Sequence, residues 1–148
     1  NLHTKLITKA FTPYLTKKTI KGSVFYNKNT VSVNRDQPYY QYKSFTNNFT
    51  IEIDDVLYWI KIKNGLLIGD IELGKNAHFE NSFKKLKSIA FKNGIKQIHV
   101  QASPNTIICK LMANYISAET SWIVGYKNFN SKFPLDKLRL TFGDLDTF

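Results

Sequence analysis

The sequence predicts an α+β domain in which two helices pack on a mixed, mostly antiparallel sheet. Two β-type runs, Val56–Lys63 and Leu66–Leu73, are separated only by an Asn-Gly pair. Both turn residues tolerate the positive φ angles of a tight hairpin turn, so the runs are expected to pair. After this hairpin the apolar spacing changes to a helical period. Its members are Phe79, Phe83, Leu86 and Ala90.

A second strand and a second helix are expected to follow. Asn93-Gly94 is typical of a helix end, and Ile95–Ala102 alternates apolar and polar residues as a half-buried strand does. Ser103-Pro104-Asn105 is expected to open the next helix, with Pro104 in a first turn where its missing N–H costs little. Two closing strands are expected at Trp122–Tyr126 and Leu138–Phe142.

The N-terminal third is expected to be less regular. Residues 1–48 are interpreted as an arm with short strands and residues 49–148 as the core, together forming one domain. Pro13 interrupts any helix within residues 1–20. Short β-type runs bounded by Asn, Gly and Pro come next. They are Ser23–Tyr26, Thr30–Val33, Tyr39–Lys43 and Phe49–Ile53.

Composition limits the class of protein. The 148 residues are enough for one hydrophobic core. No run approaches the roughly 20 apolar residues of a membrane-spanning helix, and the N-terminus lacks the apolar stretch of a secretory signal. Cys109 is the only cysteine, which favours the reducing cytoplasm. The chain does not begin with Met, so a piece of a longer parent chain, or one subunit of an oligomer, is a further expectation.

The charge balance predicts an anionic partner. Lys and Arg number 21 against 11 Asp and Glu, a net charge of +10. Such an excess attracts nucleic acid, phosphorylated cofactors or an acidic protein partner, although Lys-rich codon usage explains it equally well. Residues 39–45 interleave aromatic rings with Lys43. Exposed rings of this kind stack on single-stranded bases, whereas the same alternation is also that of an ordinary strand.

Residues 81–112, NSFKKLKSIAFKNGIKQIHVQASPNTIICKLM, combine a helix, Asn-Gly-Ile-Lys, a strand, an Asn and a second helix. With the preceding hairpin, this order resembles the C-terminal half of the GNAT acyltransferases over about residues 49–129. The ending KLRLTFGDLDTF is similar to the tail of some GNAT-like bacterial chains. The resemblance implies a GNAT-like fold that transfers an acetyl or other acyl group from acyl-CoA to an amine. Residues 1–48 do not supply the two helices that precede the family's second strand.

The resemblance also implies where acyl-CoA binds. In the family the cofactor pyrophosphate lies at the loop after the third long strand and at the next helix N-terminus, where free N–H groups face the anion. The corresponding cofactor-binding residues are Gly74, Lys75, Asn76 and, before the second helix, Asn105. The family's glycine-rich turn is reduced here to Gly74. Lys75 supplies charge but does not replace a glycine that is needed for space.

Two residues are candidates for proton transfer. The family often has a Tyr seven residues after the Asn, as general acid for the leaving thiolate. Met112 occupies that position here, so Tyr115, less than one turn further, is a displaced candidate or simply part of the core. His99 lies in the polar stripe of Gln97, His99 and Gln101, where it is either a general base or a solvent-facing strand residue.

Acidic residues cluster near predicted strand ends, in Gly69-Asp70-Ile71-Glu72 and Gly143-Asp144-Leu145-Asp146. Alternating carboxylates can bind Mg²⁺, as in nucleases. A nuclease of the three-strand type needs Glu-x-Lys, but Lys75 comes one residue too late after Glu72 to share its strand face. We therefore interpret these carboxylates as solvent-exposed strand ends.

Overall fold

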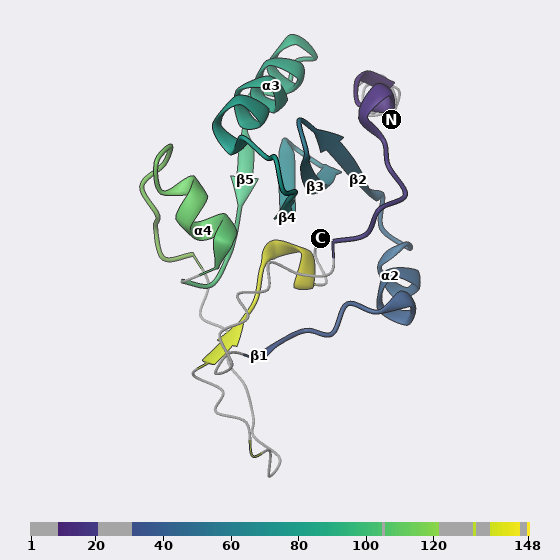
Figure 1. The fold of residues 1–148 in the computed structure, drawn as a ribbon, viewed down its shortest axis with the longest axis vertical. Coiled ribbons are helices and arrows are strands. Elements are labelled where there is room, and N and C mark those ends of the chain that lie inside the picture. The colour runs from purple at the N-terminus through teal and green to yellow at the C-terminus, as the bar shows by residue number, and fades with distance from the viewer. Residues whose placement is uncertain (1–8, 21–30, 105, 122–131, 133–136, 146–147) are drawn as a thin grey trace.

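A four-stranded mixed sheet lies at the centre of the fold (Figure 1). This computed structural model describes residues 9–20, 31–104, 106–121, 132, 137–145 and 148. The strand order is β2-β3-β4-β5, with antiparallel pairs except for the parallel pair β4–β5. The strands are β2 (Asn48–Ile53), β3 (Val56–Ile62), β4 (Leu66–Leu73) and β5 (Ile98–Val100). The predicted α+β class with a mostly antiparallel sheet is confirmed.

Helices and a short strand pair surround this sheet. The helices are α2 (Gln37–Lys43), α3 (Phe79–Lys92), α4 (Ile107–Met112), and the 3-10 turns η1 (Thr12–Tyr14) and η3 (Phe142–Asp144). The parallel pair consists of β1 (Val31–Ser32) and β6 (Leu138–Arg139). Helix α4 lies on the β5 side of the main sheet and α2 on the β2 side (Figure 1). Within the described ranges, no helix is long and apolar enough to cross a membrane.

The predicted hairpin is present, with a slightly longer turn than expected. Ile62 pairs with Leu66, so the loop contains three residues rather than two. Asn64 and Gly65 adopt φ angles of 53° and 145°, which is the backbone geometry that favoured these residue types in a turn. The predicted strand Phe49–Ile53 also pairs as expected, as part of β2.

One face of the sheet packs against α3 and α4. The buried apolar residues of α3 are Phe83, Leu86 and Ala90, and those of α4 are Ile108 and Met112. They pack against alternate strand residues in one core. This is the arrangement expected from the helical period of the apolar residues in α3 and from the period of two in the strands. The helix predicted from the period of Phe79 to Ala90 is therefore confirmed, and Asn93 and Gly94 follow its end.

The opposite face of the sheet carries a second core. Its buried members are Ile20, Leu57, Trp59, Leu67, Phe142 and Phe148. Phe148 is fully buried and its ring lies against Gly69. A Cβ at position 69 would lie only 2.4 Å from that ring, so the close approach requires a glycine there. The C-terminal residues therefore cover this face, together with the rings of Tyr39 and Tyr40 from α2.

The prediction of a strand at Tyr39–Lys43 is wrong, because these residues belong to the helix α2. The Asp36 carboxylate accepts a hydrogen bond from the Tyr39 N–H, and Pro38 lies in the first turn. Both features favour a helix start. Tyr39 and Tyr40 then turn toward Trp59, with ring centroids 6.3 and 5.4 Å away. Burial raises the pKa of the Tyr40 hydroxyl to about 12.

Three predicted boundaries differ from the structure. Helix α4 begins at Ile107 with Thr106 as N-cap, so Pro104 precedes the helix instead of lying in its first turn. The strand predicted at Ile95–Ala102 is shortened to β5, because pairing with β4 covers only three residues. The predicted closing strand Leu138–Phe142 is divided, since β6 ends at Arg139 and η3 starts at Phe142.

Two predicted strands lie outside the described residues, Ser23–Tyr26 and Trp122–Tyr126. Of the predicted strand Thr30–Val33, residues Val31 and Ser32 form β1.

Candidate ligand-binding site at the open edge of β4

Strands β4 and β5 separate after a short paired stretch. The parallel register joins Leu66 to Ile98 and ends at Ile68 with Val100, although β4 continues to Leu73. A β-bulge marks the point of separation, since Ile60 pairs with Ile68 and Trp59 with Asp70. Gly69 is the extra residue, and a bulge of this kind bends a strand away from its neighbour.

The C-terminal segment takes the place along β5 that β4 leaves. The Gln97 carbonyl accepts a hydrogen bond from Leu66 in β4, and the Gln101 carbonyl accepts one from the Phe142 N–H at 2.7 Å. Carbonyls of alternate residues in an extended strand point to the same edge. Residues 140–142 therefore lie on the β4-facing edge of β5, where Ala102 and Thr141 form an isolated antiparallel bridge. The space next to β5 is filled by the chain itself.

Among the described residues, the second half of β4 has no neighbouring strand on the side away from β3. The Gly74 N–H donates to the Asp55 carbonyl, so alternate residues Glu72 and Asp70 face β3. Ile71 and Leu73 consequently face away from β3, and the Ile71 N–H donates to the Asp70 carboxylate at 2.8 Å. In the described part of the chain, no backbone group bonds the Leu73 N–H or the Ile71 carbonyl on this side. We call residues 71–73 the open edge of β4.

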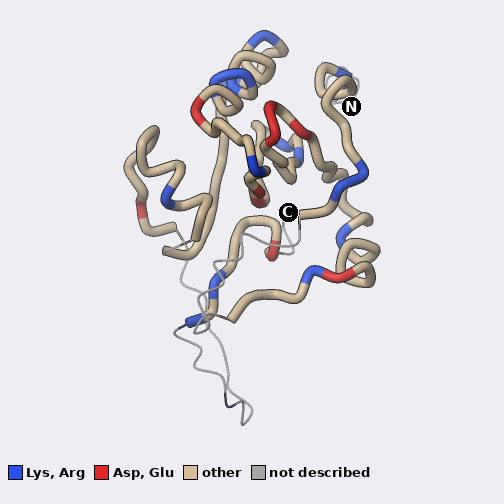
Figure 2. The backbone as a smooth tube through the Cα atoms, viewed as in Figure 1, with Lys and Arg blue, Asp and Glu red and all other residues tan. Residues whose placement is uncertain are grey.

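The loop after β4 is tied to the turn between β2 and β3. The Asn76 N–H donates to the Asp55 carboxylate at 2.8 Å, beside the Gly74 to Asp55 backbone bond. A Cβ on Gly74 would lie 2.0 Å from that carboxylate, which explains the glycine. Figure 2 shows this acidic turn close to the loop. The amides of Gly74 and Asn76, predicted to hold a pyrophosphate, are thus already bonded to Asp55.

The start of α3 has no capping side chain. His78 is the N-cap residue, and its side chain makes no capping hydrogen bond. The first-turn amides of residues 79–81 therefore lack a side-chain acceptor of this kind. Lys75 is exposed in the preceding loop. An anion at this end of α3 would meet a lysine and a helix N-terminus together.

The two predicted catalytic residues lie on opposite faces of the sheet. Tyr115 packs edge-on against Phe83, with ring centroids 4.9 Å apart, and the Lys87 ammonium lies 5.2 Å from the Tyr115 ring. Tyr115 therefore lies beside α3, at the core formed by the sheet with α3 and α4. His99 follows Ile98, which packs in that core, so its side chain points to the other face and lies against Gly65. Asn105 lies outside the described residues.

A buried ionic cluster, which the sequence did not predict, joins the second core to β4. The Arg35 guanidinium bonds Asp70 and Asp144, and the three side chains are 3% exposed or less. Burial alone lowers the pKa of Arg35, but hydrogen bonding to Asp144 and the charges of both carboxylates raise it above its usual value. The interpretation of Asp70 and Asp144 as solvent-exposed strand ends is therefore wrong.

No family model matches this chain, no curated protein matches it, and no solved structure matches its fold.

Proposed function

We propose that this chain is a GNAT-like acyltransferase domain that binds acyl-CoA along the open edge of β4. The observation that supports this proposal is the early end of β4–β5 pairing, which leaves Leu73 and Ile71 paired with β3 but, among the described residues, without a strand on their other side. The pantetheine arm of CoA is an extended chain with amide groups. Such a chain can pair with a strand edge as an added peptide strand does.

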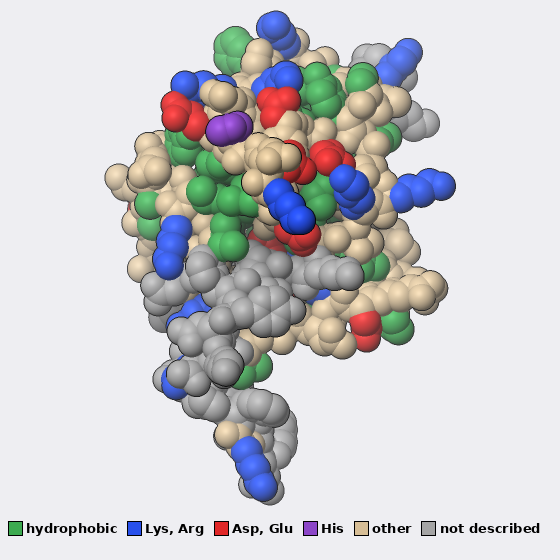
Figure 3. Space-filling model, viewed as in Figure 1, with side chains coloured by type: hydrophobic (Ala, Val, Ile, Leu, Met, Phe, Trp, Pro, Cys, Tyr) green, Lys and Arg blue, Asp and Glu red, His purple; other side chains and the backbone are tan. Residues whose placement is uncertain are grey.

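The phosphate end of the cofactor would lie at the start of α3. Gly74 and Asn76 are engaged by Asp55, so the pyrophosphate would use the first-turn amides of α3 and the Lys75 ammonium instead. Basic side chains are scattered among acidic ones on the face seen in Figure 3, without one large patch. On this face, local geometry rather than a broad basic patch would therefore select the cofactor.

The reaction proposed is acyl transfer to an amine. The amine nitrogen attacks the thioester carbonyl carbon, a C–N bond forms and the C–S bond breaks. The departing thiolate takes up one proton and the amine loses one. Tyr115, on the same face as α3, is the proposed proton donor, whereas His99 faces the other side of the sheet and has no role at this site.

Acetyl-CoA is expected to raise the melting temperature as its concentration exceeds Kd, because it binds the folded chain alone. Lys75→Glu should remove most of the shift by placing a carboxylate beside the pyrophosphate. The matched control is Lys92→Glu, which makes the same charge change at the other end of α3. Differential scanning fluorimetry measures both. No shift at millimolar acetyl-CoA in the unaltered protein would contradict the proposal.

A second candidate function is a non-catalytic basic module that binds nucleic acid or a protein partner. Tyr42 and Phe45 favour it, since they are 54% and 66% exposed and their ring centroids lie 5.4 Å apart. Tyr40 is excluded as a stacking platform because its ring packs against Trp59. The two exposed rings are the part of the aromatic segment that could stack on bases.

If that function holds, single-stranded oligonucleotides should bind with an affinity that falls steeply as salt rises. Tyr42→Ala and Phe45→Ala should each weaken binding by about 1–3 kcal/mol per stacked base. Phe91→Ala is the control, because Phe91 is an equally apolar ring, 77% exposed, on α3. Fluorescence anisotropy measures the three affinities. Equal affinities for all three variants would exclude base stacking at residues 42 and 45.

A further inference from the structure

Charge is distributed unevenly along the strands of the main sheet. The acidic residues of the sheet lie toward the end with the β2–β3 turn, and they are Glu52, Asp54, Asp55, Asp70 and Glu72. The opposite end, where the β3–β4 hairpin turns and β5 begins, carries Lys61, Lys63, Lys96 and His99. We call residues 45–48, 61–67 and 96–99 the hairpin end of the sheet. These three ranges contain no Asp or Glu.

The strand register places a row of side chains on one face of the hairpin end. Lys61 pairs with Asn48 of β2 and with Leu67 of β4, and Leu67 pairs with His99 of β5. Residues that lie directly opposite each other have side chains on the same face of a sheet. The row therefore crosses all four strands, which is roughly 14 Å at ordinary strand spacing. Its face is that of the second core, because Leu67 belongs to that core.

The exposed ring pair of Tyr42 and Phe45 lies next to this row. The Asn48 side chain, at the β2 end of the row, donates hydrogen bonds to the Lys43 carbonyl at 2.9 Å and to the Thr46 hydroxyl at 2.6 Å. These two bonds hold the segment that carries both rings beside the first residue of β2. The ring pair and the row therefore lie at the same end of the sheet.

Two exposed lysines of the hairpin end, Lys63 and Lys96, have no acidic partner among the described residues. Exposed lysines elsewhere do form ion pairs, as Lys18 does with Glu52. Burial and the charge of Lys63 together lower the pKa of the Lys61 ammonium, so two like charges lie near each other here. A bound anion would offset the repulsion between them.

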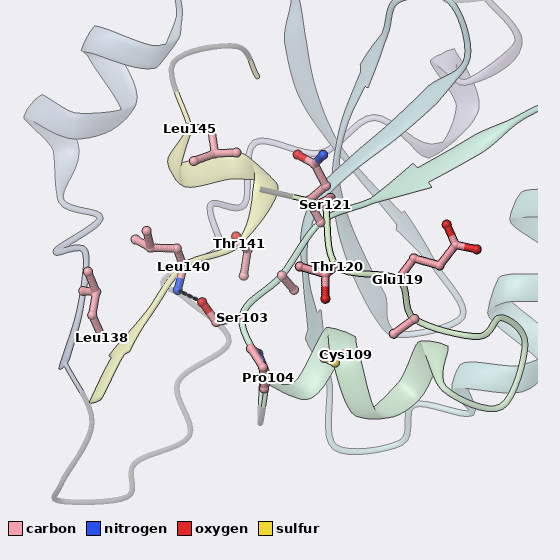
Figure 4. Close-up of a pocket in the computed structure, with 13 residues that line it drawn as sticks. Ser103, Pro104, Cys109, Glu119, Thr120, Ser121, Leu138, Leu140, Thr141 and Leu145 are labelled. Carbon is pink, nitrogen blue, oxygen red and sulfur yellow. Dashed lines mark hydrogen bonds between the residues drawn. The ribbon is translucent and has the colours of Figure 1, made fainter. Parts of the chain in front are cut away.

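The other end of β5 has a different character. A cavity of about 470 Å³ lies there, with Pro104, Cys109, Leu138 and Leu140 among its lining residues (Figure 4). The described part of this lining contains no Lys or Arg, and its charged residue is Glu119. A phosphate in the cavity would lose hydration without gaining a cation. Along β5, attraction for an anion is therefore confined to the hairpin end.

We infer that the hairpin end binds single-stranded nucleic acid, with Lys63 and Lys96 at its phosphates and the exposed ring pair on its bases. This inference rests on the second candidate function and adds the path of the nucleic-acid backbone to it. Exposed rings are able to stack on the faces of unpaired bases. Readout of a duplex commonly uses bidentate arginines, and the two arginines of the chain, Arg35 and Arg139, lie outside the hairpin end. The surface is also separate from the open edge of β4, which is at the far end of that strand.

Fluorescence anisotropy with a labelled oligothymidylate of about ten nucleotides, a length within the usual site size, tests the inference. For single strands, the logarithm of the affinity falls with the logarithm of the salt concentration by a slope of about 0.7 per phosphate contact. Lys63→Gln and Lys96→Gln should therefore each reduce the slope by about 0.7. Lys17→Gln is the matched control, because Lys17 is exposed and precedes Lys18, which pairs with Glu52 at the acidic end. This control should leave the slope unchanged.

The outcomes separate this inference from the second candidate function. Suppose that Tyr42→Ala and Phe45→Ala weaken binding, while both lysine variants keep the salt slope of Lys17→Gln. The path of the backbone would then be overturned and base stacking would stand. No binding of the oligothymidylate at low salt would overturn both. A duplex of the same length that binds as tightly as the single strand would overturn the assignment to single strands.

Discussion

Replacing Arg35 with methionine is expected to lower the free energy of unfolding by about 3–5 kcal/mol. The guanidinium bonds Asp70 of β4 and Asp144 of η3 within the second core. Methionine fills a similar volume but removes the cation, so two carboxylates would stay buried without it. Urea unfolding followed by circular dichroism measures the loss. The Arg35 guanidinium also lies 5.5 Å from the ring centre of Trp59, one of the two tryptophans, so part of the tryptophan fluorescence comes from this region.

The matched control for this variant is Lys18→Met, which removes the cation of an exposed ion pair with Glu52. Exposed pairs contribute roughly 0–1 kcal/mol, so this change should be nearly silent. Adding Asp70→Asn and Asp144→Asn to Arg35→Met should recover part of the lost stability, because the buried groups become neutral. Equal small effects of Arg35→Met and Lys18→Met would show that the ionic cluster does not hold the C-terminal segment on the sheet.

Phe83→Ala is expected to cost about 3–5 kcal/mol, the usual result of deleting a buried ring. The Phe83 side chain is 4% exposed and packs from α3 against the core of the sheet and against Tyr115. Its ring also stacks on Phe79, with centroids 5.4 Å apart. The surrounding rings cannot all move into the space, so a cavity would remain. Thermal and urea unfolding measure the change.

Phe91→Ala removes the same side chain from the same helix, eight residues later. Phe91 is 77% exposed, so its loss should change stability by about 0.5 kcal/mol or less. The difference between the two alanine variants isolates burial from helix propensity, which is identical for both. If the two variants lost similar stability, the assignment of the buried face of α3 would be incorrect.

The parts of the fold that were predictable from sequence are those set by local chemistry. Asn64 and Gly65 adopt positive φ angles, and the apolar period from Phe79 to Ala90 places one face of α3 on the sheet. Turn residues, strand alternation and helix period agree along this stretch, so each signal supports the others. The central hairpin and the helix after it could be placed for this reason.

Helix α2 was missed because two local signals compete there. The alternating rings of residues 39–42 favour a strand, while Asp36 and Pro38 favour a helix start. The helix forms because the cap bond from Asp36 is made and because Tyr39 and Tyr40 reach Trp59. That second cause is a tertiary contact, which spacing along the chain does not reveal.

The candidate site was only partly predictable. The loop of Gly74 and Lys75 does precede α3, as the resemblance implied, but the bond between Asp55 and Asn76 joins residues 21 positions apart. Arg35 and Asp144 are 109 residues apart in the chain. The repeated Gly-Asp pairs at residues 69–70 and 143–144 were the available signal for this cluster. Nothing in their local pattern indicated that an arginine neutralises both.

Acyl-CoA bound along β4 would contact the Leu73 backbone amide and the first-turn amides of α3. Amide chemical shifts of the isotope-labelled protein, recorded as acetyl-CoA is added, test this most directly. The expected result is saturable shifts at Leu73 and at residues 79–81, which become much smaller in the Lys75→Glu variant. Unchanged amides at Leu73 and residues 79–81 in millimolar acetyl-CoA would contradict the proposed acyl-CoA site, whether or not amides elsewhere respond.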